Sequence, residues 1–353
     1  TDGHEMMRRL LRPTMRAVAM PTACLSRLAP RLARPLATKP STELIKELRT
    51  RTSAPMKKCV EALKASEGDL EAAMDWLRKS GVATAAKKAG RGANEGAVAV
   101  ASGDAGLVLV EINSETDFVA RNDIFHVLAG GVAQTALSQV SGGGGGGPRE
   151  LDAAALGALP VEQGAAAAAV PATEAISMAV SQLGENLVLR RACALPTPAA
   201  GGAVASYVHN AYAPGLGRTV AAVALRSQAE PAALQALGAK LSMHIVAAAP
   251  RYLGRDDVEP AALERERSIV TEQAAASGKP EKAQQKMVEG RLAKFYQETC
   301  LLEQQYLIEE KAGAVSKVLE KASKELGSEV ALEGFLRFHV GEGIAAEAEG
   351  ESA

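Results

Sequence analysis

Residues 97–121 read AVAVASGDAGLVLVEINSETDFVAR, and this stretch decides the fold. It begins with two short apolar runs, Ala97–Ala101 and Leu107–Ile112, on either side of Gly103-Asp104-Ala105-Gly106. Short apolar runs that flank a glycine-rich turn favour a pair of strands. The residues that follow predict a helix from about Asn122 to Ser138, because their apolar side chains fall on one helical face.

A similar succession of strands and a helix occurs further along the chain. The strands are predicted at Asn186–Ala194, Ala203–His209 and Thr219–Leu225, and the helix at Pro231–Ala249. Strands followed by a helix, twice over, indicate an α+β fold with a duplicated core. We assign residues 83–140 to its first half and residues 176–255 to its second half.

Residues 41–82 are predicted to form a module of three short helices. Their apolar residues recur at helical spacing in three groups: Leu44, Ile45 and Leu48; Met56, Cys59, Val60 and Leu63; and Leu70, Ala73, Met74 and Leu77. So small a core is marginal alone, and such units commonly serve as docking modules. The basic, alanine-rich residues 83–92 are expected to be a solvated helical connector to the core.

Residues 141–175 have a low-complexity composition, with six consecutive glycines at 142–147 and an alanine run at 165–169. This composition predicts a flexible surface insertion between the two core halves. The glycine run is not a phosphate-binding loop, because no Lys-Ser or Lys-Thr pair follows it.

Residues 256–326 are charged and helical in pattern, with a break at Gly278-Lys279-Pro280. This pattern predicts an antiparallel helical hairpin, a coiled coil. Residues 327–353 are expected to hold a last core strand, at Gly334–Val340, and an acidic tail.

Residues 1–40 are rich in arginine. They carry seven arginines and Lys39 against Asp2 and Glu5, which gives a net charge of +6, and the chain after the first methionine has no acid in this segment. Such a composition is typical of an organellar transit peptide, and the excess of arginine over serine favours the mitochondrion over the chloroplast. The alternative is a basic tail that binds nucleic acid.

The composition of the remaining chain excludes several classes of function. With −1 overall, the residues after 40 carry −7, which argues against direct binding of nucleic acid. No apolar run reaches the roughly 18 residues that cross a bilayer. The four cysteines form no CxxC pair, and no histidine lies at ligand spacing from them, so we expect no metal and no cofactor.

Six stretches, in the same order along the chain, resemble the elongation factor Ts family, in its organellar, mitochondrial form. They are LIKELRTRTSAPMKKCVEA (44–62), DLEAAMDWLRKSGVATAAKKAG (69–90), EINSETDFVAR (111–121), GENLVLRR (184–191), GKP with MVEGR (278–291) and FLRFHVGEGI (335–344). The resemblance covers nearly all of residues 42–344. Pro55, Val60, the Gly/Ala segment and the long loop expected after His209 depart from the family's pattern.

The resemblance implies a ubiquitin-associated-like helical module, a core of two related α+β halves and a helical hairpin. It also implies a function: a guanine-nucleotide exchange factor that binds elongation factor Tu and promotes release of its GDP during organellar translation. Such a factor has no catalytic residues of its own.

The resemblance further implies the residues that contact elongation factor Tu. Phe118 is the expected wedge into the phosphate and Mg²⁺ region of the GTPase, with Asp117 making a polar contact beside it. The other expected contacts are Thr116, Val119, Met56, Gly184, His209 and His244. The residue patterns alone also allow structural roles: Phe118 and Met56 in the core, and His209 and His244 as hydrogen-bonded structural histidines.

Two other functions stay open on the residues alone. An enzyme would need acid–base chemistry from a pair such as Asp117 and His209 in a deep polar pocket, although no common catalytic motif is present. A non-catalytic scaffold would bind a partner through residues 42–81 and leave nucleotide release unchanged.

Overall fold

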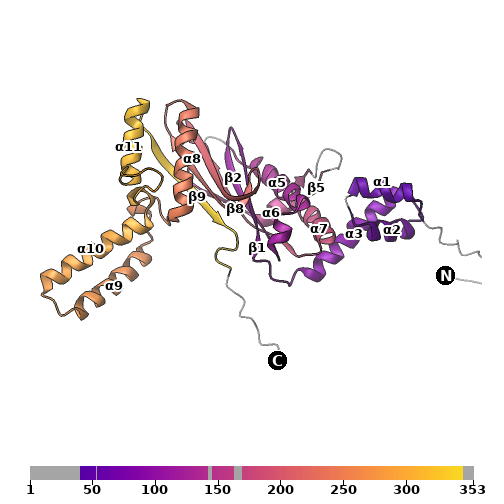
Figure 1. The fold of residues 1–353 in the computed structure, drawn as a ribbon, viewed down its shortest axis with the longest axis horizontal. Coiled ribbons are helices and arrows are strands. Elements are labelled where there is room, and N and C mark those ends of the chain that lie inside the picture. The colour runs from indigo at the N-terminus through magenta and orange to yellow at the C-terminus, as the bar shows by residue number, and fades with distance from the viewer. Residues whose placement is uncertain (1–39, 53, 142–144, 163–168, 345–353) are drawn as a thin grey trace, which may run out of the picture. The chain divides into compact units, whose positions relative to one another are not determined.

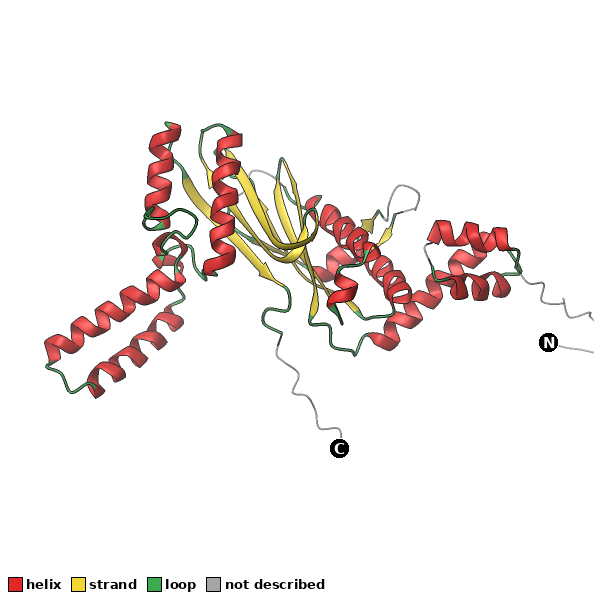
Figure 2. Cartoon of the chain, in the orientation of Figure 1, coloured by secondary structure: helices red, strands yellow, loops and turns green. Residues whose placement is uncertain are grey.

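The computed structural model describes residues 40–52, 54–141, 145–162 and 169–344. Residues 1–39 of the expected transit peptide and residues 345–353 of the acidic tail lie outside the described residues. Figures 1 and 2 show a mixed α+β fold in which helices pack on a curled antiparallel sheet. No helix in the described ranges is long and apolar enough to cross a membrane.

The N-terminal part consists of helices α1 (Thr42–Thr52), α2 (Met56–Ala65) and α3 (Leu70–Lys88). They bury a small shared core, made of Leu48, Ala54, Cys59, Ala62, Leu63 and Ala73. The Asp69 side chain caps α3 by accepting a hydrogen bond from the Ala72 N–H at 2.8 Å.

Helix α3 continues past residue 82, where the three-helix module was expected to end. A Cβ at Gly81 would lie 3.4 Å from the carbonyl oxygen of Ser177, so the glycine brings α3 close to helix α7 (Ala172–Leu183). Arg78 also forms an ion pair with Glu174 of α7. The expected helical connector is therefore helical as far as Lys88 and packs on the core.

The first group of strands is β1 (Glu95–Gly103), β2 (Gly106–Ser114) and β6 (Leu187–Pro196). Strands β1 and β2 form the expected hairpin, and β2 also pairs with β6 along its whole length. Helix α5 (Asp123–Leu137) and α7 cover one face of this group, and their buried side chains form a single core with it. Strand β6, which we assigned to the second core half, thus pairs with β2, which we assigned to the first.

The Gly/Ala segment differs from the expected flexible insertion. Its described residues form β3 (Arg149–Leu151), which pairs with β6, then α6 (Ala153–Ala158), β4 (Pro160–Val161) and β5 (Val170–Pro171). Leu156 and Val161 are buried in the core beneath α5 and α7. A few apolar side chains therefore anchor residues 145–162, which composition alone did not reveal; glycines 142–144 and residues 163–168 lie outside the described residues.

The second group of strands is β7 (Gly202–Ala213), β8 (Leu216–Arg226) and β9 (Ala331–His339). Helices α8 (Pro231–Ala248) and α11 (Val315–Leu326) bury their apolar side chains against it. The expected long loop after His209 is wrong, because both strands continue to a tight turn at Pro214-Gly215. A register shift between Ala211 and Ala213, with Asn210 at φ +51°, keeps the hairpin paired despite the weak strand pattern there.

The two groups meet through a short pairing of β1 with β8 and through a shared core. This inner core takes the side chains on the faces that point away from the helices, among them Val98, Leu109, Val220 and Phe338. Strand β2 is consequently buried on both faces over its full length.

Helices α9 (Pro260–Ala276) and α10 (Glu281–Thr299) pack against each other around Gly278 at φ +65°, where the sequence predicted the break. The pair ends at Thr299. The rest of the segment 256–326 contains a short 3-10 helix, η2 (Leu301–Glu303), and α11, which packs on the second strand group; a second short 3-10 helix, η1 (Arg255–Asp257), precedes α9.

Candidate partner-binding site

The strongest candidate site is the turn that leaves β2. Thr116 caps the short helix α4 (Asp117–Ala120), and its side-chain oxygen accepts from the Val119 N–H at 3.5 Å. Val119 and Ala120 are buried and anchor the turn in the core, whereas 80% of the Phe118 surface is exposed. An aromatic ring left in water loses the free energy of its burial, so this exposure favours a contact role for Phe118 over the alternative core role.

Asp117 lies beside the exposed ring and is held by a cation. Its carboxylate is 3.7 Å from the Arg121 guanidinium, which in turn lies 4.9 Å from the centre of the Tyr212 ring. Tyr212 belongs to the end of β7, which connects the second strand group to this turn. No sequence pattern pointed to Tyr212, because it falls in the stretch that was expected to be a loop.

Gly184, one of the expected contacts, lies next to the same turn, because its neighbour Glu185 is hydrogen-bonded to Thr116. It ends α7 with φ +82°, and a Cβ there would meet only the Lys88 Nζ, at 3.8 Å. The position therefore favours glycine for its left-handed backbone. The following residue, Glu185, accepts hydrogen bonds from both the backbone N–H and the hydroxyl of Thr116, so the two sequence stretches meet here.

His209 is exposed on β7, with its ring centre 6.1 Å from that of Tyr207. It is on the same strand as Tyr212, and its exposure is compatible with a partner contact. Within the described residues no hydrogen bond or ion pair joins His209 to Asp117, whose carboxylate is paired with Arg121.

His244 is fully buried, not on the surface where a contact residue was expected. Its Nδ1 accepts a hydrogen bond from the Leu307 N–H at 3.4 Å, so its Nε2 donates to Gln304 Oε1 at 3.1 Å. Burial lowers the pKa of His244 below its usual value, which favours the neutral ring. These contacts support the structural role that the residue pattern had left open.

Two exposed apolar residues next to His244, Met243 and Leu307, are candidate contact residues that the sequence analysis did not identify. Leu307 is 57% exposed and Met243 is 37% exposed. Leu307 lies in the irregular segment between η2 and α11, where periodicity carries no information about exposure. Met243 lies in α8, whose residue pattern predicted an apolar helix but did not indicate that Met243 is exposed to solvent.

Met56 is the first residue of α2 and is 58% exposed, whereas Cys59 and Leu63 of the same helix are buried. Of the two roles that helical spacing allowed for Met56, its exposure favours a surface contact over the core.

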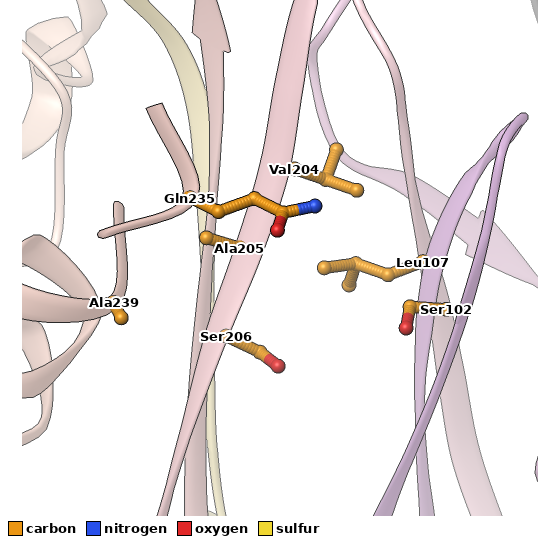
Figure 3. A pocket seen from close by; sticks show the side chains of 7 residues that line it. All are labelled: Ser102, Leu107, Val204, Ala205, Ser206, Gln235 and Ala239. Carbon is orange, nitrogen blue, oxygen red and sulfur yellow. The ribbon is translucent and has the colours of Figure 1, made fainter. Parts of the chain in front are cut away.

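The described part of the chain contains no group of three or more His, Cys, Asp or Glu side chains that could hold a metal ion. A cavity of about 300 Å³ lies between the β1–β2 hairpin on one side and β7 with α8 on the other (Figure 3). Its polar lining consists of Ser102, Ser206 and Gln235, and neither Asp117 nor His209 reaches it.

Comparison with known proteins gives consistent matches. Residues 115–342 match the family model described as elongation factor TS. The elongation factor Ts of Rhodospirillum rubrum is 46% identical over 301 residues, which cover 85% of this chain and 92% of that protein. Those of Paramagnetospirillum magneticum and Rhodospirillum centenum are 46% and 43% identical, over 85% and 86% of this chain and 91% and 94% of their own lengths.

These relatives correct one expectation. All three are bacterial proteins, which contradicts the expected mitochondrial location and its chloroplast alternative. The expectation rested on the arginine content of residues 1–40, and composition is a weaker criterion than identity over most of the chain. On the matches along residues 115–342 and over 85% of its length, the chain belongs to the elongation factor Ts family.

Proposed function

We propose that this chain is a guanine-nucleotide exchange factor that binds elongation factor Tu and promotes release of its GDP during translation elongation. Family membership supports the activity, and the exposed Phe118 on an anchored turn is the observation that carries the mechanism. The factor makes and breaks no covalent bond.

The physical requirement is a difference in affinity. A GTPase holds GDP through backbone amides around the phosphates and through Mg²⁺. A factor that binds the nucleotide-free GTPase more tightly than the GDP form weakens GDP binding by the same ratio, since linkage is reciprocal. A ~1000-fold weakening corresponds to about 4 kcal/mol of coupling.

Phe118 supplies part of this coupling. Moving its exposed ring from water into the GTPase contributes about 1.5–3 kcal/mol, and that contact forms only where the nucleotide site has opened. Asp117 makes a polar contact beside the ring, Thr116 shapes the turn, and Val119 anchors it. Gly184 borders the same surface.

We extend the contact surface to three other elements. His209 contributes from β7 and Met56 from α2. His244 contributes indirectly, by supporting the backbone of the exposed Leu307.

Finer features of the fold belong to the same proposal. Residues 41–82, which hold α1, α2 and most of α3, act as a ubiquitin-associated-like docking module. The strand groups β1–β2–β6 and β7–β8–β9 are the duplicated halves, and α9 with α10 is a coiled-coil hairpin. Each strand group has its own helical cover and its own core, which supports the duplication.

The test is the release of fluorescent GDP from bacterial elongation factor Tu, with the chain added in catalytic amounts. We expect strong acceleration by the unmodified chain. Phe118→Ala is expected to reduce kcat/KM for exchange by about 10- to 100-fold, the ratio that corresponds to the lost burial.

Ile269→Ala serves as the control, because it removes a 43% exposed apolar side chain from α9 and is expected to leave exchange unchanged. Unchanged release with Phe118→Ala, in a variant that unfolds at the same temperature as the unmodified chain, would refute the wedge. Binding through residues 41–82 with no acceleration at all would leave the scaffold function instead.

A further inference from the structure

Two carboxylates make crossed contacts where the Phe118 turn meets the end of α7. The Glu185 carboxylate accepts the Thr116 N–H at 2.9 Å and the Thr116 hydroxyl at 2.6 Å. In the opposite direction, the Glu115 carboxylate accepts the Asn186 N–H at 2.6 Å. We call these four residues, Glu115, Thr116, Glu185 and Asn186, the carboxylate clamp.

The clamp is tied to two further parts of the fold. The Asn186 side chain donates to the Arg91 carbonyl at 2.8 Å, in the connection between α3 and β1. The Ser114 hydroxyl donates to the Thr116 carbonyl at 2.8 Å, at the end of β2. The clamp thus ties the Thr116 backbone to the start of β6 and to the α3–β1 connection, both distant in sequence, while Ser114 holds it locally.

The turn needs this support because it has little of its own. Helix α4 has only four residues, and so short a helix is not stable by itself. Phe118 is mostly exposed, so packing holds its ring very little. The direction of the ring therefore depends on the backbone at Thr116 and on the anchor at Val119.

We propose that Glu185 is a positioning residue for Phe118: by binding both donors of Thr116, its carboxylate holds the turn in the conformation that presents the ring to the GTPase. This inference rests on the proposed exchange function. A turn that is ordered before binding has less conformational entropy to lose when the partner binds. Loss of the clamp should therefore weaken exchange although Glu185 itself touches no nucleotide.

The first measurement is GDP release with Glu185→Ala, which is expected to reduce kcat/KM by about ten- to thirtyfold. Glu185→Gln keeps one acceptor and should give an intermediate rate. The matched control is Glu333→Ala on β9, because Glu333 likewise accepts a backbone N–H, that of Gly146 at 2.9 Å, and pairs with Arg226. We expect this control to exchange nucleotide at the rate of the unmodified chain.

The second measurement separates positioning from general loss of structure. If Glu185 acts through Phe118, Glu185→Ala should cause little further loss in a chain that already carries Phe118→Ala. Equal losses in both backgrounds would overturn the proposal. So would unchanged exchange in Glu185→Ala.

A readout independent of exchange keeps this inference distinct from the proposed function. Hydrogen–deuterium exchange of the peptide 114–120 should be faster in Glu185→Ala than in the unmodified chain, because the Thr116 N–H loses its acceptor. Faster deuterium uptake in a chain that accelerates no GDP release would mean that the exchange function fails while the clamp stands. Unchanged uptake would overturn the clamp even if exchange is confirmed.

Discussion

At the scale of single residues, the buried Glu111 carboxylate accepts several hydrogen bonds from three separate segments of the described chain. Its carboxylate is fully buried and accepts from Arg190 at 2.9 Å, Arg191 at 2.6 Å and the Gly341 N–H at 2.9 Å. Three of the stretches that resembled the family, around residues 111, 190 and 341, therefore meet at one side chain. The contacts of Glu111 therefore hold these three stretches together.

Replacing Glu111 by glutamine should destabilise the fold. The substitution leaves Arg190 and Arg191 without their charged acceptor, and we expect a loss of about 2–4 kcal/mol in the free energy of unfolding, limited by the partial exposure of both arginines. Urea denaturation at pH 7 measures it. Glu309→Gln, which breaks the surface pair with Lys240, should leave the urea midpoint almost unchanged.

The same residue predicts a dependence on pH. Burial alone would raise the pKa of Glu111, but the hydrogen bonds from Gly341, Arg191 and Arg190 outweigh it and hold the pKa below its usual value. A lowered folded-state pKa adds stability above the unfolded-state pKa of about 4.3, and that stability is lost as the pH falls through the folded-state pKa. The difference between the unmodified chain and Glu111→Gln should therefore shrink below about pH 4. A difference that stays constant between pH 7 and pH 3 would contradict this role.

At the scale of elements, the end of α7 depends on one backbone conformation. Gly184 has φ +82°, and space around it is open, so strain and not crowding limits substitution. We expect Gly184→Ala to lower the free energy of unfolding by about 1 kcal/mol and Gly184→Asn to lower it less, since asparagine tolerates the left-handed region. Thermal unfolding of the two variants measures this. An alanine variant as stable as the glycine form would mean that α7 ends differently in solution.

The elements that the sequence predicted well are those with a regular apolar period. Periodicity located the β1–β2 hairpin, α5 and α8 to within a few residues. It missed the end of β7, where Asn210 and the Pro214-Gly215 turn interrupt the alternation, although backbone pairing continues through the irregularity. It also missed the anchoring of residues 145–162, because Leu156 and Val161 are too sparse to form a period.

The candidate site was predictable to a lesser degree. The residue pattern alone favoured a core role for Phe118, and only the resemblance pointed to the exposure that the structure has. The buried His244 is hydrogen-bonded to Gln304, which is 60 residues away in sequence, and a local sequence pattern cannot predict such a contact. Glu185 lies in one of the stretches that resemble the family, 184–191. Its contact with Thr116 could not be predicted, because the two residues lie in segments that are distant in sequence.

At the scale of the whole molecule, the α9–α10 pair buries few side chains. Val270 and Ala274 are the buried residues of α9, and α10 buries none. At its base, the Thr299 carbonyl accepts the N–H groups of Arg251 and Tyr252 at 2.9 and 3.1 Å, so both ends of the pair start from one place.

We therefore expect a chain in which residues 263–292 are replaced by four Gly/Ser residues to keep its fold. Four extended residues span about 13 Å, enough to join helices whose axes are about 8–10 Å apart. The melting temperature should change by no more than a few degrees, as followed by circular dichroism. Loss of the cooperative transition would show that the helical pair stabilises the sheet, contrary to this expectation.

The pairing of strands was the least predictable level, because it joins segments that are distant in sequence. Strand β6 follows β2 by more than 70 residues and β9 follows β8 by more than 100, yet each pair is adjacent in the sheet. An apolar pattern predicts that a strand has a buried face, but it does not predict which strand lies beside it. The sequence pattern therefore did not show that β6, which we assigned to the second core half, pairs with β2.

The inner core between the strand groups has a consequence for biosynthesis. The residues of this core range in sequence from Val98 to Val340, and β2 is buried on both of its faces. Because the N-terminal part of a domain emerges first from the ribosome, the inner-core face of β2 is covered in stages, and the last strand of this core, β9, arrives only after more than 200 further residues have been translated. Such long-range contacts also slow folding, since chain closure precedes the contacts that reward it. A nascent chain of this length is thus exposed to aggregation until β9 arrives, and chaperone binding should concentrate on chains that still lack it.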